Sequence, residues 1–411
     1  MRKALWTLAD QGMASLSNLL LTIVIARECG PDELGAFGAA FAIYLILTGL
    51  SRAVAAEPLL VRFSDVPPAE HRAGARACLG STLVLGVAGL AVLLAGSALT
   101  AGPLGAALGA LAWVLPALLV KDTLRFVFLA ADRHAAAFAC DLTWVTVQIA
   151  ALAGILLYGR PELTWFILAW GLSAAAASLQ GLIHARCLPS PARMPSWLRD
   201  HRDLLPGYVG DFAARSGGRQ LTMLAVGWLG GLAALGAIRA AEVLFSVLNV
   251  MLQAGHLAAI PAAVAARRRG RLRRTTLFLG LTLAGASLVY GVAVLLVPAP
   301  LGQALVGETW RLAQPVLAAE VALYASIAAV TAAAVGLRAA GDARRGALVR
   351  LAVVPCSLAA GLAGAALGGA AGAILGLAVV NWLALPFWIQ QFRRVTRADS
   401  RARADAAPAI G

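Results

Sequence analysis

Residues 4–26 read ALWTLADQGMASLSNLLLTIVIA, and residues 34–61 read LGAFGAAFAIYLILTGLSRAVAAEPLLV. A short charged turn, RECGPDE, joins the two segments. Each segment is long enough to cross a bilayer, for which about 20 apolar residues suffice. Neither is purely apolar, because Asp10 and Asn18 lie in the first and Arg52 in the second. Polar groups at bilayer depth are costly, so these are candidate functional residues, with an interhelical hydrogen bond as the alternative.

The polar residues of the first segment share one face. At about 100° per residue, Asp10, Gln11, Asn18 and Thr22 fall within an arc of about 120°. A polar face turned away from lipid must meet protein or water.

Apolar segments recur along the whole chain. Of its 411 residues, 60% are hydrophobic and only 13% are charged, which excludes an ordinary soluble domain. The pattern predicts an all-α polytopic membrane protein with about twelve transmembrane helices. The expected spans are 5–26, 34–61, 77–100, 104–130, 135–158, 162–185, 204–229, 232–262, 275–298, 312–337, 347–367 and 370–391.

The basic residues predict the orientation in the membrane. With the N-terminus on one side, that side carries 25 of the 34 Lys and Arg residues and the opposite side three. This asymmetry places both termini in the cytoplasm. The net charge of +14 therefore reflects loop arginines that set orientation, and no nucleic-acid partner is expected. The five cysteines are scattered, so neither a metal site nor a cofactor is expected.

The two halves of the chain are similar in sequence. GPDELGAFGAA begins at Gly30 and GLAALGAIRAA at Gly231, so both follow the pattern GxxxLGAxxAA at an offset of 201 residues. The same offset aligns Asp10 with Asp211. We therefore expect two pseudo-symmetric six-helix bundles at residues 1–186 and 204–392. A cytoplasmic linker at 187–203 joins them, and a basic cytoplasmic tail follows at 393–411.

Six cations lie inside predicted spans, which is the main functional clue. They predict a cationic, substrate-binding cavity formed by Arg52, Lys121, Arg125, Arg215, Arg219 and Arg239. A regular polar stripe on the eighth span supplies further cavity residues, together with Asn18 from the first span: Glu242, Ser246, Asn249 and Gln253. The alternative is that charges on one helix pair with one another, as Arg239 would with Glu242.

Carboxylates inside spans suggest two other roles. Asp10 and Asp211 are candidates for coupling transport to H⁺ or Na⁺. Lys121 and Asp122 are neighbours, so a local ion pair explains them almost as well as a cavity does. Asp141 is an isolated carboxylate for which a packing role is expected, with binding of a coupling ion as the alternative.

The opening of the chain resembles a known family. ADQG before a polar-striped span, followed by ARECGPDELGAF, looks like the start of Wzx-type polysaccharide flippases. These belong to the multidrug/oligosaccharidyl-lipid/polysaccharide (MOP) exporter superfamily, which includes MATE-like transporters. The resemblance implies an alternating-access flippase, not an enzyme, in the bacterial plasma membrane. Its substrate would be a polyprenyl-diphosphate-linked oligosaccharide used for cell-surface polysaccharide, with polysaccharide polymerase and glycosyltransferases as partners.

Arginines suit that substrate, because a guanidinium binds phosphate bidentately and stays charged. One alternative is a cation-coupled multidrug exporter of the same fold, which should prefer carboxylates and aromatic residues in its cavity. A membrane ligase or polymerase is a second, although the short outer connectors leave little room for a catalytic domain. A scaffold or an uncoupled scramblase is a third.

Overall fold

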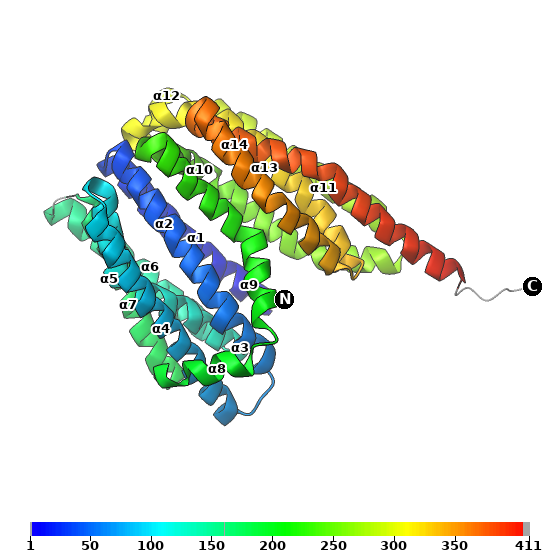
Figure 1. Ribbon diagram of the computed structural model, residues 1–411, viewed down its shortest axis with the longest axis horizontal. Helices are drawn as coiled ribbons and strands as arrows, with labels where there is room; N and C mark the ends of the chain where they lie inside the picture. Colours follow the sequence, from blue (N-terminus) through cyan, green and yellow to red (C-terminus); the bar gives the residue numbers. More distant parts are fainter. Residues whose placement is uncertain (1, 160, 406–411) are drawn as a thin grey trace, which may run out of the picture. The chain divides into compact units, whose positions relative to one another are not determined.

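The computed structural model describes residues 2–159 and 161–405, and their regular structure is helical (Figure 1). In unit 1, defined below, the helices are α1 (Arg2–Glu28), α2 (Pro31–Ser51), α3 (Glu57–Arg62), α4 (Pro68–Leu99), α5 (Gly102–Ala130), α6 (His134–Tyr158), α7 (Leu163–Ala185), α8 (Met194–Asp200) and α9 (Leu205–Phe212). They are followed by α10 (Gly218–Arg268), α11 (Leu272–Leu295), α12 (Ala299–Val306), α13 (Trp310–Ala339) and α14 (Ala343–Asp405). Short 3₁₀ segments are Pro191–Arg193 and Gly307–Thr309, and π-helical segments are Arg52–Ala56 (η1) and Ala213–Gly217 (η3).

The predicted spans are found as helices. Within the described residues, nine helices are long and apolar enough to cross a membrane. Two of the long helices are each bent at glycines: α10 at Gly231, where φ is 81°, and α14 at Gly368 and Gly369. Each is therefore long enough to supply two consecutive spans. The all-α, multi-pass fold with about twelve helices is confirmed.

Contacts divide the chain into two compact units. Unit 1 comprises residues 1–240 and 303–310, and unit 2 comprises 241–302 and 311–411. The predicted bundle boundary at residues 187–203 stays a prediction.

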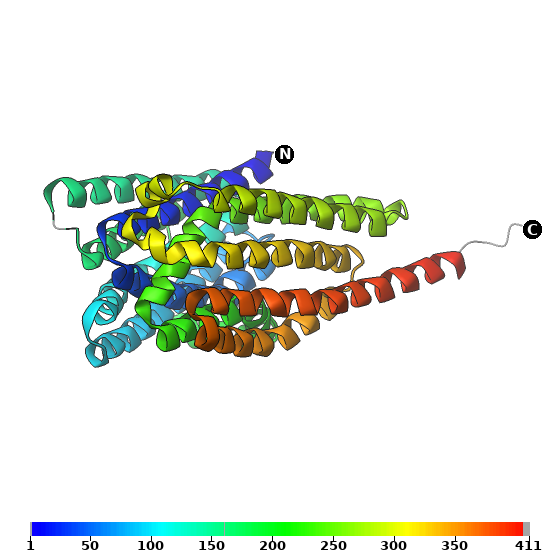
Figure 2. The ribbon, with the colours of Figure 1, turned by 90° about the horizontal axis from the view of Figure 1, so that it is seen from above.

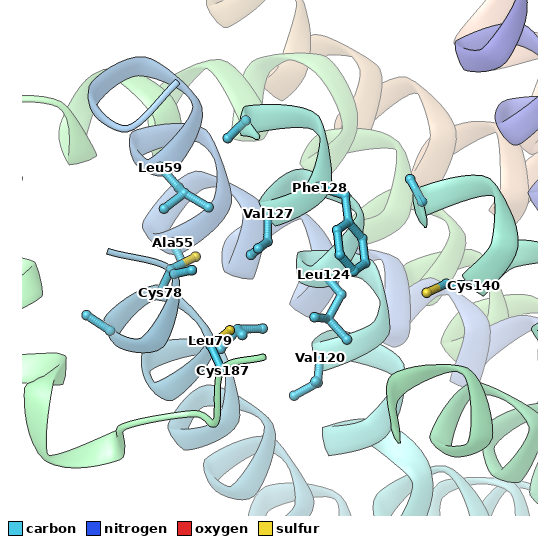
Figure 3. Close-up of a cluster of buried hydrophobic side chains, with 14 of the residues drawn as sticks. Ala55, Leu59, Cys78, Leu79, Val120, Leu124, Val127, Phe128, Cys140 and Cys187 are labelled. Carbon is cyan, nitrogen blue, oxygen red and sulfur yellow. The ribbon is translucent and has the colours of Figure 1, made fainter. Parts of the chain in front are cut away.

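In unit 1, α5 packs against both α4 and α7, and α7 packs against α6. Figure 3 shows the buried cluster that these helices share with the linker, including Leu79 of α4, Phe128 of α5 and Cys187. In unit 2, the core includes Trp388 of α14 and Leu337 of α13. Figure 2 shows the two halves of α14, orange and red, running antiparallel.

The expected linker, residues 187–203, belongs to unit 1 and packs against its helices. Trp197 of α8 is buried, and its Nε1 donates a hydrogen bond to the carbonyl oxygen of Val54 at 3.0 Å. Its ring stacks on Phe63 with centroids 5.8 Å apart. Arg62 donates to both carboxylate oxygens of Asp203 at 2.8 Å. The buried tryptophan and these hydrogen bonds hold α8 against the end of α3.

The two copies of the GxxxLGAxxAA pattern meet each other inside unit 1. A Cβ at Gly35 would overlap the backbone of Leu232, and one at Gly236 would overlap the carbonyl oxygen of Pro31. The offset of 201 residues relates Gly35 to Gly236 and Pro31 to Leu232, so the crossing is reciprocal. Only glycine permits so close a backbone approach. The repeated glycines therefore bring α2 and residues 232–240 of α10 together within unit 1.

Candidate functional site

Arg52 occupies the first position of the π-helical segment η1, within the second span. Its Nε and Nη2 donate to the two carboxylate oxygens of Asp122 on α5 at 2.7 and 2.6 Å. The side chain of Asp122 is 11% exposed and that of Arg52 is 41% exposed. Single-turn π-helical segments occur frequently at functional sites. The bidentate pair fixes the guanidinium plane, while much of its surface stays accessible.

Lys121, one residue earlier on α5, faces a different carboxylate. Its Nζ forms an ion pair with Oδ1 of Asp141 on α6, and both side chains are buried. The same Nζ lies 3.9 Å from the centroid of the Trp144 ring. The alternative of a local Lys121–Asp122 pair is wrong, whereas the packing role expected for Asp141 is compatible with its buried ion pair. Neighbours on a helix point about 100° apart, so each carboxylate meets a cation from elsewhere.

Hydroxyl groups continue this polar interior. Ser51 of α2 donates to Thr82 of α4 at 3.3 Å, and Thr82 shares a 3.0 Å hydrogen bond with Thr123 of α5. In the same unit, Ser17 of α1 donates a hydrogen bond to the side-chain oxygen of Gln148 on α6. Polar groups are costly in a membrane interior unless they are hydrogen-bonded, so these contacts stabilise the packing of α1, α2, α4, α5 and α6.

Asn18, predicted as a cavity residue, is half-buried on α1. Its backbone oxygen accepts from Thr22 at 2.7 Å. No donor among the described residues reaches its buried side-chain oxygen, Oδ1. That oxygen is therefore a buried acceptor without a donor among the described residues.

Arg239, on the second half of α10, lies against an aromatic cluster. Its guanidinium carbon is 4.2 Å from the ring centroid of Phe41 and 5.8 Å from that of Phe37. Phe41 packs with Trp170 of α7 at 5.9 Å, and Tyr44 meets the same tryptophan edge-on at 4.8 Å. A cation over an aromatic face gains up to about 2 kcal/mol when desolvated. The aromatic surface of this unit is thus already occupied by one of the chain's own cations.

The other predicted site residues are less closely defined. Arg125, Arg219 and Asp211 in unit 1, and Glu242 in unit 2, are half-buried and take part in further interactions. Ser246 donates to the carbonyl oxygen of Val243 at 2.7 Å, and Asn249 and Gln253 are exposed. The side chains of Asp10 and Arg215 lie outside the described residues. A shared cavity for this whole set stays a prediction.

Sequence reasoning missed the partners of the cations. Asp122, Asp141 and Trp144 were not in the predicted site, yet they orient Arg52 and Lys121. A usable signal was present, because a membrane interior that holds buried cations needs carboxylates nearby. The spacing of residues along the chain does not show which carboxylate meets which cation.

No protein-family model matches the sequence, and no curated protein matches it either. The solved structures do show its fold, which is like that of MATE family transporters of the MOP superfamily. An inward-facing multidrug resistance MATE transporter superposes with a TM-score of 0.72 at 14% identity, covering 94% of this chain and 95% of that one.

Two further structures show how varied the proteins with this fold are. The lipid II flippase MurJ, in an inward closed conformation, superposes with a TM-score of 0.65 at 10% identity and covers 96% of this chain and 90% of its own. A MOP superfamily transporter from Pyrococcus furiosus, described as having a binding pocket of reverse polarity, gives a TM-score of 0.56 at 14% identity over 97% of this chain and 95% of that one. At such identities the likeness shows the fold alone.

Proposed function

We propose that this protein is an alternating-access flippase that moves a polyprenyl-diphosphate-linked oligosaccharide from the inner to the outer leaflet. The observation that carries the proposal is the geometry of Arg52. Asp122 holds its guanidinium through Nε and Nη2, and no described residue accepts a hydrogen bond from Nη1. An oriented, partly exposed guanidinium inside a membrane span suits a phosphate oxygen.

The depth of Arg52 supports this role. It lies ten residues before the end of α3 at Arg62, about 15 Å along the helix axis at 1.5 Å per residue. A diphosphate headgroup entering from that end would meet the guanidinium part-way across the bilayer.

A multidrug exporter is the second candidate, because one of the similar structures is a multidrug resistance transporter. Its cationic substrates would seek carboxylates and aromatic faces. In unit 1, however, Asp122 and Asp141 are already neutralised by Arg52 and Lys121, and Arg239 covers Phe41. These contacts argue against a cationic substrate.

The membrane potential is the proposed driving force. Moving one charge through 100 mV is worth about 2.3 kcal/mol, so a negative interior drives an anionic headgroup outward. Coupling to H⁺ or Na⁺ through Asp10 or Asp211 is the competing mechanism. Collapse of the potential at constant pH and Na⁺ should slow flipping, and an unchanged rate would exclude this drive.

The test is flipping of a fluorescent polyprenyl-diphosphate oligosaccharide in proteoliposomes. We expect Arg52→Ala and Arg239→Ala to slow flipping at least tenfold, while Arg27→Ala, at the exposed end of α1, leaves it unchanged. The Arg52→Ala variant leaves the carboxylate of Asp122 without its ion-pair partner. The double variant Arg52→Met/Asp122→Leu therefore serves as a control, because it removes both charges together. Wild type that moves cationic dyes but not the glycolipid would overturn the proposal.

A further inference from the structure

A pocket lies at one end of unit 1. It has a volume of about 780 Å³ and is formed by the start of α4, the end of α5 and the end of α7 with their connecting turns. Its floor includes Val127, Phe128 and Cys187, which belong to the buried cluster in Figure 3. The volume is within the usual range for small-molecule sites, about 300–1,000 Å³. The distribution of arginines predicts that this end of the helices faces the cytoplasm.

Three exposed arginines make the rim of this pocket positive. Arg72 lies near the start of α4, Arg133 directly before α6 and Arg186 directly after α7, and Asp132 is the carboxylate among the lining residues. Asp132 in turn pairs with His134, whose Nε2 lies 3.1 Å from Oδ1. The rim therefore has an excess of positive charge, which suits an anion.

Arg133 is held in place at this rim. Its Nη1 donates to the carbonyl oxygen of His184 at 3.0 Å, and its guanidinium carbon lies 5.4 Å from the centroid of the Phe128 ring. An arginine anchored in this way loses less conformational entropy when it binds an anion.

The backbone is strained at the same place. Asp132 has φ of 56° and Arg186 has φ of 50°, and these are the non-glycine residues with positive φ in the described parts of the chain. Such a conformation is uncommon for arginine and costs of order 1–3 kcal/mol. Backbone strain of this kind is concentrated at ligand-binding sites.

An exposed apolar stripe leads away from the pocket along α7. Trp165, Leu172, Leu179 and Ile183 are exposed, and their spacings of seven, seven and four residues place them on one helix face. Ile183, 65% exposed, belongs both to this stripe and to the pocket lining. In a membrane protein such a stripe faces acyl chains. A ligand with an anionic head and an apolar tail would fit the rim and the stripe together.

We propose that this pocket binds the phosphate headgroup of an anionic phospholipid of the inner leaflet, with an acyl chain along the exposed stripe of α7. The lipid would be a bound modulator or anchor, not the transported substrate. Basic pockets between transmembrane helices on the cytoplasmic side are suited to anionic headgroups. The inference does not depend on what the protein transports.

The test is lipid binding to the delipidated full-length protein, measured by native mass spectrometry. The probes are dioleoyl-phosphatidylglycerol, dioleoyl-phosphatidylcholine with the same acyl chains, and inorganic phosphate as a soluble anion. The pocket variant is Arg133→Ala/Arg186→Gly, in which glycine tolerates the positive φ. The matched control is Arg199→Ala/Arg202→Ala, which removes two exposed arginines that do not line the pocket.

We expect phosphatidylglycerol to bind wild type and the control variant alike, and the pocket variant at least tenfold more weakly. The proposal would be overturned if phosphatidylcholine bound wild type as tightly as phosphatidylglycerol does. It would also be overturned if phosphatidylglycerol bound the pocket variant as tightly as the control variant. Inorganic phosphate binding as tightly as the lipid would reassign the pocket to a soluble anion. If the pocket variant does not fold, a photoactivatable phosphatidylglycerol on wild type decides, since crosslinks must map to the pocket lining at residues 63–75, 127–133 and 183–187 or to the stripe of α7. Crosslinks confined to other segments would refute the site.

Discussion

Replacement of Lys121 by methionine should destabilise the protein far more than the loss of an ordinary surface charge. Lys121 and Asp141 form an ion pair in which both side chains are buried, at 8% and 1% exposure. Removing the lysine leaves the carboxylate of Asp141 in an apolar environment with no cation. Removing one partner of a buried ion pair lowers the free energy of unfolding by about 3–5 kcal/mol.

The structure predicts an asymmetry between the two partners. In Asp141→Asn, Lys121 keeps the face of Trp144, whose centroid is 3.9 Å from Nζ. A desolvated cation–π contact is worth about 2 kcal/mol, so this variant should lose only about 1–3 kcal/mol. The double variant Lys121→Met/Asp141→Leu removes both charges and should lie within about 2 kcal/mol of wild type.

The assay is equilibrium unfolding of the purified protein in detergent, with all variants measured under one set of conditions. A coupling free energy of at least about 2 kcal/mol is expected between the two positions. Additive effects of the single substitutions would refute the buried ion pair. Flipping by the double variant separates the roles: a stable but inactive protein would assign Lys121 to the substrate path.

Three further predictions concern other parts of unit 1. Gly236→Ala should lower the free energy of unfolding by at least about 2 kcal/mol, because its Cβ would overlap the Pro31 carbonyl oxygen; Gly210→Ala, with open space around it, should not lower it. Burial and the charge of Glu33 raise the pKa of Cys29 to about 12. Alkylation of Cys29 as the only cysteine should therefore speed up about tenfold per pH unit from pH 8 to pH 10, and a plateau near pH 9 would contradict this. Trp197→Ala should make residues 187–203 at least tenfold more sensitive to protease, whereas Trp113→Ala, at an exposed position, should not.

The order and extent of the helices were predictable from the sequence because transmembrane length is a local property. Some 20 apolar residues in succession must form a helix in lipid, where every backbone group needs an internal partner. The repeat was also visible, because Gly30 and Gly231 begin the same pattern. The reciprocal contact of Gly35 and Gly236 was not, since it depends on where two helices cross.

The identity of the membrane cations came from the sequence alone, whereas only the tertiary structure decided their partners. Arg52 and Asp122 are 70 residues apart, and a third helix carries Asp141, which neutralises Lys121. Adjacent charges on one helix point apart, while distant residues meet when helices pack. The local pattern therefore determined which residues enter the membrane, and the packing of α2, α5 and α6 determined which of their charges remain accessible.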